Sequence, residues 1–349
     1  MKTDLFDYEL PGELIAFHPS PKRDDSRLLV VPPLGGFVHG GVSSLPDHIP
    51  EEALMILNDT RVVPARLRAR RPTGGAVEVL LVRMTADGEG VSEWLAMCRS
   101  NKPLRPGDRL ILGGGMSARV EAKGPGGDVA LLIDAPPSAV RAHMESAGEV
   151  PLPPYINRPV EPADRERYQT VFATRDGSVA APTAGLHFTP ALLRALEQRG
   201  VGIEFITLHV GPGTFRPIKA DSLEEHTMDA EYFVIGEGTA RAIATAGEDG
   251  RPVIAVGTTV VRALEGRAAA EGAVTAGAGA TEIFISPPFE FRVVDGLMTN
   301  FHLPRSTLLC LVSALVGRER ILDAYREAVE RGYRFYSYGD AMLLLPRKR

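Results

Sequence analysis

Hydrophobic and polar positions follow two different patterns along the chain. Between about Thr60 and Asp134 apolar and polar residues alternate in short runs such as AVEVLLVRM, DRLIL and DVALLI, which Gly-rich turns separate. A period of two is typical of strands, and several short strands with tight turns predict a small antiparallel barrel or sandwich. The segment PPSAVRAHMESAG then has the pattern of a helix, with Ser138 expected as its cap and Gly148 as its end.

From about residue 189 onward, apolar strand-like runs alternate with helical ones. TPALLRALEQRG is the clearest helix, because Thr189 can cap it, Pro190 suits its first position and Gly200 can end it. VGIEFITLHV, EYFVI and PVIAV follow as expected strands, and TARAIATAGEDG, TTVVRALEGRAAAEG, STLLCLVSALVG and RILDAYREAVERG as expected helices. The Ala/Gly run EGAVTAGAGA is expected to be a loop. Such alternation is typical of a mostly parallel or mixed sheet covered by helices.

These patterns predict an α/β protein in which a larger mixed α/β domain is interrupted by an inserted small antiparallel β-barrel domain. We expect the larger domain to contain residues 1–60 and 151–349 and the barrel domain to contain residues 61–150. The first boundary follows LNDTR, where the composition changes, and the second lies at VPLPPYINRPVEP, whose five prolines fit neither a helix nor a strand.

Composition narrows the class of protein. The 349 residues are 44% hydrophobic and 24% charged, which is typical of a globular protein. No run approaches the roughly 18 apolar residues of a membrane-spanning helix, and MKTDLFDYEL is too acidic for a signal peptide. Two cysteines are too few for a disulfide framework. We therefore expect a cytoplasmic protein without a membrane partner.

The net charge of −5 argues against a protein that coats nucleic acid by bulk attraction, but it allows a local basic patch. In RVVPARLRARR, Arg66, Arg68 and Arg70 alternate along an expected strand and so point to one side. Two interpretations remain open: a solvated strand face, which is the commoner case, or a face that contacts phosphates.

Four segments place polar side chains or glycines directly after apolar strands, where α/β proteins tend to form ligand clefts. They contain Asn58, Asp59, Thr60 and Arg61; His209, Gly211, Gly213 and Thr214; Gly257, Thr258 and Thr259; and Asn300 and His302. Glycines allow a close approach of the backbone to a ligand, and a helix start suits an anion such as a carboxylate.

APTAGLHFT, residues 181–189, places His187 in a kinked apolar segment that could exclude water from it. A lone histidine is more often structural than catalytic, so only the accumulation of such segments favours an enzyme. The chain lacks the motifs GxxxxGK[ST], GxGxxG between strand and helix, GxSxG and HExxH. We therefore expect no metal site.

The residues of several motifs, and the order of these motifs along the chain from His18 to Leu343, show a family resemblance. HPSPKRDDSRLLV, LNDTRVVPARL, LPPYINRP, RYQTVFA, AAPTAGLHF, LHVGPGTFRPI, EEHTMDAEYF, VIAVGTTVVRALE, TNFHLPRSTLLCLVSA and AYREAVERGYRFYSYGDAML together resemble the S-adenosylmethionine:tRNA ribosyltransferase-isomerases of queuosine biosynthesis. The resemblance implies a large α/β domain with a β-barrel inserted after NDTR.

The resemblance also implies a reaction. Members of this family act on tRNAs for Asp, Asn, His and Tyr that carry 7-aminomethyl-7-deazaguanine at the wobble position. They transfer the ribosyl part of S-adenosylmethionine to the aminomethyl nitrogen and rearrange it, which yields epoxyqueuosine, adenine and methionine. S-adenosylmethionine is thus a consumed substrate, and no cofactor is implied. We expect a monomer.

This chemistry needs a base beside the sulfonium-activated ribose carbon, an acid that helps adenine to leave, and exclusion of water. The candidate catalytic residues are His187, His209, Asp59 and Glu282, among which base and acid stay unassigned. The candidate S-adenosylmethionine contacts are Asn58, Thr60, Thr183, Gly185, Gly211, Gly213, Thr214, Gly257, Thr258, Thr259, Asn300 and His302. The candidate tRNA contacts are Arg61, Arg66, Arg68, Arg70, Tyr336 and Tyr338, although both tyrosines could instead be packing residues.

Two other functions fit parts of the pattern. One is a different enzyme that uses S-adenosylmethionine on this scaffold, for nucleoside or methyl transfer. The other is an RNA-binding protein without catalysis. The released products separate these alternatives, because methyl transfer leaves S-adenosylhomocysteine and simple binding leaves S-adenosylmethionine intact.

Overall fold

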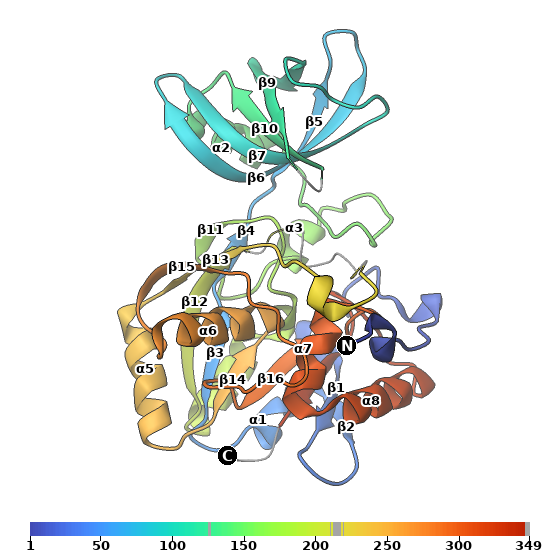
Figure 1. Cartoon of the computed structure of the whole chain (residues 1–349), viewed down its shortest axis with the longest axis vertical. Helices are drawn as coiled ribbons and strands as arrows, with labels where there is room; N and C mark the ends of the chain where they lie inside the picture. The colour runs from blue at the N-terminus through green and yellow to red at the C-terminus, as the bar shows by residue number, and fades with distance from the viewer. Residues whose placement is uncertain (125–126, 210, 212–217, 219, 346–349) are drawn as a thin grey trace.

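The computed structural model describes the chain except for residues 125–126, 210, 212–217, 219 and 346–349. It consists of a large α/β body and a smaller barrel that projects from one end of it (Figure 1). The predicted fold class, a mixed α/β domain with an inserted antiparallel β-barrel, is confirmed.

A mixed nine-stranded sheet forms the centre of the large body. Its order is β15 (Gly277–Thr281), β13 (Glu231–Ile235), β12 (Gly202–His209), β3 (Leu54–Asn58), β14 (Val253–Val256), β16 (Gly296–Asn300), β17 (Ala341–Leu344), β1 (Arg27–Val31) and β2 (Val38–Gly41). The four strands from β12 to β16 are parallel to one another. All five residues of β3 are buried, as expected of a central parallel strand covered on both faces.

Helices cover both faces of this sheet. On one face α5 (Glu237–Glu248) and α6 (Thr258–Glu271) contact β3, and α7 (Thr307–Val316) and α8 (Arg318–Glu330) continue the same core, which contains Leu54 and Ile56 of β3. On the other face α1 (Leu45–His48) and α4 (Pro190–Gln198) pack against Met55 and Leu57. The alternation along β3 thus divides its side chains between two cores.

The barrel is closed and antiparallel. Its strands are β10 (Asp128–Ile133), β7 (Val91–Ser100), β6 (Ala76–Gly88), β5 (Arg66–Arg70), β8 (Arg109–Gly113) and β9 (Met116–Lys123), in the order in which they pair. Val140 and Met144 of α2 (Pro137–Ala147) complete its core. Between the barrel and the large body, β4 (Thr60–Val62) pairs with β11 (Arg175–Ser178). Closure leaves no free strand edge in the barrel.

Short helical segments fix the connections around the large sheet. They are η1 (Thr3–Phe6), η2 (Gly12–Leu14), η3 (Arg23–Asp25), η4 (Val42–Ser44), α3 (Asp164–Arg167), η6 (Thr183–His187) and η8 (Leu223–Glu225). Two of them, η3 and η6, pack against each other beside the carboxyl end of the sheet.

Most expected elements are present, and one cap prediction is confirmed in atomic detail. The hydroxyl of Thr189 accepts a hydrogen bond from the Leu192 amide at 3.1 Å, which caps α4 as predicted. The prediction that Ser138 caps α2 was wrong, because the helix already begins at Pro137 and Pro136 is its N-cap residue.

The prediction that EGAVTAGAGA forms a loop was also wrong, because its end forms the edge strand β15. Small residues are required there: a Cβ atom at Gly279 would lie 2.7 Å from the Arg267 guanidinium and 2.9 Å from the Phe233 ring. Arg267 in turn donates to the carbonyls of Gly277 and Ala278. The strand is held by its neighbours and not by its own β propensity.

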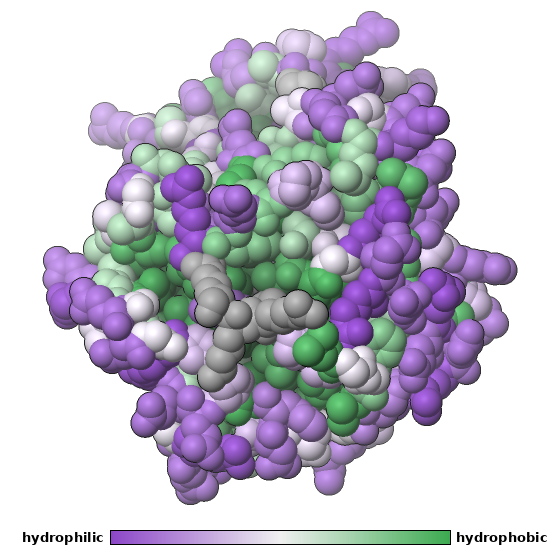
Figure 2. Space-filling model, turned by 60° about the horizontal axis from the view of Figure 1, so that its bottom comes forward, coloured by the Kyte–Doolittle hydropathy of each residue, from purple (hydrophilic) through white to green (hydrophobic). Residues whose placement is uncertain are grey.

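One face of the molecule has an apolar centre and a polar margin. Figure 2 shows one face on which hydrophobic side chains gather near the centre and hydrophilic side chains surround them. Exposed apolar area of this kind is a normal part of a folded surface. Within the described part of the chain, no helix has both the length and the apolar character needed to cross a membrane.

The contact between α6 and β15 predicts an unusual response to Gly266→Ala. Alanine normally stabilises a helix interior by about 1 kcal/mol relative to glycine. At Gly266, however, a new Cβ would lie 2.2 Å from the Thr281 hydroxyl oxygen. We expect this overpacking to lower the free energy of unfolding by about 1–3 kcal/mol in urea titrations.

Gly247→Ala in α5 is the matched control, because nothing lies within 4 Å of its Cβ position. This variant should be stabilised or unchanged. Equal stabilisation of both variants would contradict the tight contact between α6 and Thr281.

Candidate active site

Parallel pairing brings three sequence-distant segments to one edge of the sheet. The Gly257 amide, just after β14, donates to the Met298 carbonyl of β16 at 2.8 Å. This bond sets the start of α6 beside Thr299 and Asn300. The segment η6 contacts β16 from the other side.

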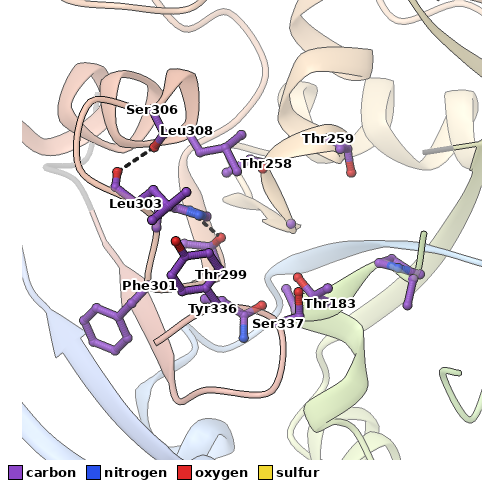
Figure 3. A pocket seen from close by; sticks show the side chains of 16 residues that line it. Thr183, Thr258, Thr259, Thr299, Phe301, Leu303, Ser306, Leu308, Tyr336 and Ser337 are labelled. Atoms are coloured by element: carbon purple, nitrogen blue, oxygen red, sulfur yellow. Dashed lines mark hydrogen bonds between the residues drawn. The ribbon is translucent and has the colours of Figure 1, made fainter. Parts of the chain in front are cut away.

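The three segments line a pocket that is open to solvent, and the turn after Phe335 completes it. Figure 3 shows Thr258 and Thr259 at the start of α6, with Tyr336, Ser337 and Thr183 across the pocket from them. The lining residues are Ala181, Pro182, Thr183, Ala184, Gly257, Thr258, Thr259, Thr299, Asn300, Phe301, His302, Leu303, Ser306, Leu308, Tyr336 and Ser337. Six predicted S-adenosylmethionine contacts are therefore among them: Thr183, Gly257, Thr258, Thr259, Asn300 and His302.

The start of α6 is suited to binding an anionic or polar group. Gly257 has φ +97°, a backbone conformation that favours glycine, and it lets the chain turn from β14 directly into the helix. The amides of Thr258 and Thr259, the first two of the helix, have no acceptor within it. Thr258 and Thr259 add hydroxyl groups at the same place.

Asn300 connects the pocket to His187. Its amide nitrogen lies 3.0 Å from His187 Nε2. Because an amide NH2 group only donates, Nε2 accepts and the ring proton resides on Nδ1. Burial lowers the pKa of His187 to about 4, so the ring is neutral at pH 7. The Asn300 Oδ1 atom is buried without a hydrogen-bond partner among the described residues.

His302 is the imidazole that lines the pocket directly. Its Nε2 atom lies 3.0 Å from the Thr299 hydroxyl, as the dashed line in Figure 3 marks. Its amide donates to the Tyr325 hydroxyl at 2.9 Å, and its carbonyl accepts from the Tyr8 hydroxyl. Burial lowers its pKa to about 3. The described lining residues thus include no group that is charged at neutral pH.

Asp59 and His209 form a second cluster, further along the same sheet edge. The Asp59 carboxylate accepts from the Thr207 hydroxyl at 2.7 Å and from the Thr174 hydroxyl at 2.9 Å. The Thr60 hydroxyl lies 3.1 Å from His209 Nδ1, and burial lowers the pKa of this histidine. Neither Asp59 nor His209 is among the described residues that line the pocket.

Asn58 holds this second cluster in place. Its side chain donates to the Leu208 carbonyl at 2.9 Å and accepts from the amides of Leu208 and Thr60 at 3.0 Å each. All three bonds join β3 to β12 or shape the turn after β3. In the described structure this predicted substrate contact is therefore a buried strand-linking residue.

The remaining predicted pocket residues lie elsewhere. Gly185 packs beneath Thr170 and Phe172, whose side chains would lie about 3 Å from an added Cβ atom. Glu282 is exposed directly after the edge strand β15. No described residue beyond its chain neighbours lies within 4 Å of a Cβ atom added at Gly211. Gly213 and Thr214 lie outside the described residues.

The predicted basic face is real, but it is partly neutralised. Arg66, Arg68 and Arg70 lie on one side of β5, with Arg68 and Arg70 exposed and Arg66 half-buried, while the residues between them are buried. Arg66 donates to the Leu152 carbonyl at 2.9 Å, and Arg68 pairs with Glu149 at 2.7 Å.

Arg61 and the two predicted stacking tyrosines have different surroundings. Arg61 pairs with Asp176. Tyr336 lines the pocket and packs against Tyr155 with ring centres 4.2 Å apart. Tyr338 is buried, and its hydroxyl donates to Asp164 at 3.0 Å, so its ring offers no open face for stacking.

Sequence reasoning missed Ser337, which lies between these tyrosines. It is 3% exposed and lines the pocket, and its hydroxyl has no hydrogen-bond partner among the described residues. The backbone of Tyr336 has φ +73°, a rare conformation for a bulky residue that often marks a functional site. The motif FYSYGD directed attention to its aromatic residues, although the serine is the polar group that the turn presents.

The motifs that form this pocket place the chain in a known family. A family model described as queuosine biosynthesis protein matches residues 3–344. The chain belongs to the queuosine biosynthesis protein family. The family resemblance expected from the sequence is thereby confirmed.

Relatives in this family match over nearly the full length. A protein from Anaeromyxobacter sp. (strain Fw109-5), named S-adenosylmethionine:tRNA ribosyltransferase-isomerase, is 52% identical over 344 residues, 99% of each chain. A protein of the same name from Thermus thermophilus is 51% identical over 353 residues, which covers 98% of this chain and 99% of the relative.

A solved structure supports the assignment to this family. The crystal structure of S-adenosylmethionine tRNA ribosyltransferase from Thermotoga maritima has a TM-score of 0.56 and 35% identity, with coverage of 98% of this chain and 100% of that chain. In the described part of this family member, no group of three or more His, Cys, Asp or Glu side chains is placed to hold a metal ion.

The neutral, buried state of His187 predicts a pH-dependent stability. Between pH 7 and pH 4.5 an unfolded histidine takes up a proton near its usual pKa of about 6.5, while folded His187, with a pKa of about 4, stays mostly neutral. The unfolded state therefore binds more protons, and the free energy of unfolding falls as the pH falls.

We expect His187→Asn to reduce this acid-induced loss by about 2 kcal/mol, measured as the difference between urea titrations at pH 7 and pH 4.5. His302, which is buried with a pKa of about 3, should retain its own share of the loss. If the free energy of unfolding of His187→Asn fell between pH 7 and pH 4.5 by as much as that of the wild type, the folded His187 ring would take up its proton as readily as an unfolded one.

Proposed function

We propose that this protein is an S-adenosylmethionine:tRNA ribosyltransferase-isomerase. It transfers the ribosyl moiety of S-adenosylmethionine to 7-aminomethyl-7-deazaguanine at the tRNA wobble position and isomerises it, which forms epoxyqueuosine and releases adenine and methionine. Its tRNA substrates are those for Asp, Asn, His and Tyr, and it acts in the cytoplasm as a monomer. S-adenosylmethionine is consumed as a substrate, and the reaction uses no resident cofactor or metal.

One observation carries this proposal. Segments from three motifs of the family resemblance, around Thr183, Thr258 and Asn300, line a single pocket although they lie far apart along the chain. Full-length similarity to proteins of that name supports the same conclusion.

The pocket has features that this reaction needs. Hydroxyl groups and the first amides of α6 can bind the carboxylate of S-adenosylmethionine. Ala181, Pro182, Ala184 and Leu303 supply an apolar wall that limits the access of water to the sulfonium. In such a neutral pocket no carboxylate balances the positive charge of the sulfonium. Cleavage of a carbon–sulfur bond, which leaves a neutral thioether, is therefore favoured.

His187 acts in this proposal through Asn300. Its neutral ring fixes the Asn300 amide, whose free Oδ1 atom can accept a hydrogen bond from a substrate N–H or O–H group. His187 Nε2 is the atom that can take up a proton when the Asn300 amide moves aside. Asp59 and His209 form the neighbouring proton-handling pair, and Glu282 is a further carboxylate for the same reaction.

The release of products tests the proposed function. Incubation with S-adenosylmethionine and tRNA carrying 7-aminomethyl-7-deazaguanine should yield free adenine, free methionine and an epoxyqueuosine nucleoside, detected by mass spectrometry. Formation of S-adenosylhomocysteine would instead indicate methyl transfer. Intact S-adenosylmethionine beside normal RNA binding would indicate a binding protein.

His187→Ala should lower kcat by about 100-fold or more, because it removes both a proton-accepting group and the support of Asn300. The affinity for S-adenosylmethionine in calorimetry and the urea midpoint should change much less. His39→Ala is the matched control, since His39 lies on β2 and bonds Tyr333 and Glu327 away from the pocket. If kcat and the urea midpoint of His187→Ala fell together, His187 would have a structural role only.

The outward arginines of the barrel predict a salt-dependent contribution to tRNA binding. Arg68→Ala combined with Arg70→Ala should weaken tRNA binding and reduce the slope of log Kd against log salt by about 1–2. Arg66 is left in place because it supports the linker carbonyl of Leu152. Arg119→Ala on β9, with a side chain 53% exposed, is the control. An unchanged slope would remove this face from the tRNA-binding surface.

A further inference from the structure

A second, smaller hollow lies directly behind the pocket. It is open to solvent and is lined by η3, η6, α3 and the turn after Phe335. Ser337 lines both the hollow and the pocket, and His187 lines the hollow. Three cationic side chains, those of Lys22, Arg23 and Arg167, also line it.

The two arginines of this hollow are oriented by neutral groups. Arg23 donates to the carbonyls of Leu186 and Glu166 at 3.2 and 2.9 Å. Arg167 donates to the carbonyls of Pro21 and Ser20 at 2.9 and 2.6 Å. Carbonyl groups fix the position of a guanidinium but do not cancel its charge.

A fourth cation stands next to the hollow. Arg334 donates to the Ser20 hydroxyl at 3.1 Å and to the His18 carbonyl. Among the described residues none of Lys22, Arg23, Arg167 and Arg334 forms an ion pair with a carboxylate within 4 Å, whereas most other arginines do.

Asp340, a buried acid that follows the lining residue Gly339, already has partners. Asp340 pairs with Arg27 at 3.2 Å and accepts from the Arg334 amide at 2.8 Å. Mutual repulsion contributes to a lowered pKa of Arg23, in which burial is the larger cause and Arg167 the second. The hollow therefore concentrates positive charge that the described residues leave without an ion-pair partner.

Two buried polar atoms also point to a missing ligand. The Nε atom of Arg167 and the hydroxyl of Ser337 are both buried without a hydrogen-bond partner among the described residues. Ser337 as a whole is 3% exposed, and its amide is fixed by a bond of 2.8 Å to the Tyr155 hydroxyl. Buried donors without partners are costly, so an acceptor in the hollow would remove this cost.

We propose that this hollow binds a backbone phosphate of the RNA that flanks the nucleotide whose base enters the pocket. A phosphate offers the multiple acceptor oxygens and the negative charge that guanidinium and ammonium donors match. Ser337, shared by both cavities, places the phosphate on one side and the base on the other. The inference rests on the proposed function for the identity of the RNA.

This assignment separates two kinds of recognition. Contacts to phosphate fix the position of a nucleotide, whereas the pocket selects its base. The target nucleotide lies in a single-stranded loop, in which a base can turn away from its neighbours into a protein cavity. A clamp on the adjacent phosphate would hold the nucleotide in that position.

Lys22→Glu tests the proposal, because Lys22 is exposed and its replacement should not disturb the fold. The probes are anticodon stem-loops carrying 7-aminomethyl-7-deazaguanine, either unaltered or with a neutral methylphosphonate at one of the two linkages that flank this nucleotide. For the wild-type protein one of the two replacements should raise Kd by about 10-fold or more. For Lys22→Glu the same replacement should cost less than about 3-fold, because the introduced carboxylate offsets much of the attraction that the remaining arginines exert on the phosphate charge.

Arg241→Glu on α5 is the control with the same change in net charge, and its side chain is 75% exposed. This variant should keep the wild-type sensitivity to the methylphosphonate. The proposal is overturned if neither replacement changes the wild-type Kd by more than about 2-fold, or if the wild type and Lys22→Glu lose the same factor.

A third measurement identifies the source of the anion. The affinity of Lys22→Glu for S-adenosylmethionine alone, measured by calorimetry, should equal that of the wild type. A loss of about 10-fold there would assign the hollow to the substrate carboxylate and overturn the RNA proposal. Adenine release with the unaltered stem-loop judges the proposed function separately, since the Kd comparison stands even when no adenine is released.

Discussion

Parallel pairing of the four central strands β12, β3, β14 and β16 is the constraint on which the rest of the structure depends. It forces their carboxyl ends to one edge of the sheet, so the turns after Asn58, Val256 and Asn300 emerge side by side. The hydrogen bond between Gly257 and Met298 then sets the start of α6 against β16. The pocket forms where the turns after Val256 and Asn300 meet at this edge.

Electrostatics divides the carboxyl edge into separate regions. The pocket itself is lined by hydroxyl, amide and apolar groups, with two histidines in or behind its wall whose pKa values burial keeps low. On the other side of Ser337, Lys22, Arg23 and Arg167 lie together without an ion-pair partner among the described residues. A neutral cavity and a cationic one thus lie next to each other at this edge, and Ser337 lines both of them.

Patterns of neighbouring residues in the sequence predicted many features of the fold and some residues of the site. Thr189 and Pro190 begin α4 as expected, since capping depends on neighbouring residues alone. The strand β15 was missed because its Gly and Ala residues have low strand propensity, and Phe233 and Arg267 impose it from outside. In the site, Thr183, Thr258 and Asn300 do meet in one pocket. Asp59 and His209 lie further along the same edge, and Ser337 escaped notice because only its burial and its unpaired hydroxyl distinguish it.

The sequence by itself determined the two classes of architecture, the positions of most strands and helices, and the family, because periodicity, capping residues and ordered motifs are local properties of the chain. Only the tertiary structure decided which polar residues share a cavity. It also decided that Asn58 links two strands and so is not free to bind a ligand, and that several cations lie together without an ion-pair partner among the described residues. Those properties depend on distances between residues that are far apart along the chain. Pairing, burial and packing set such distances, and no local pattern encodes them.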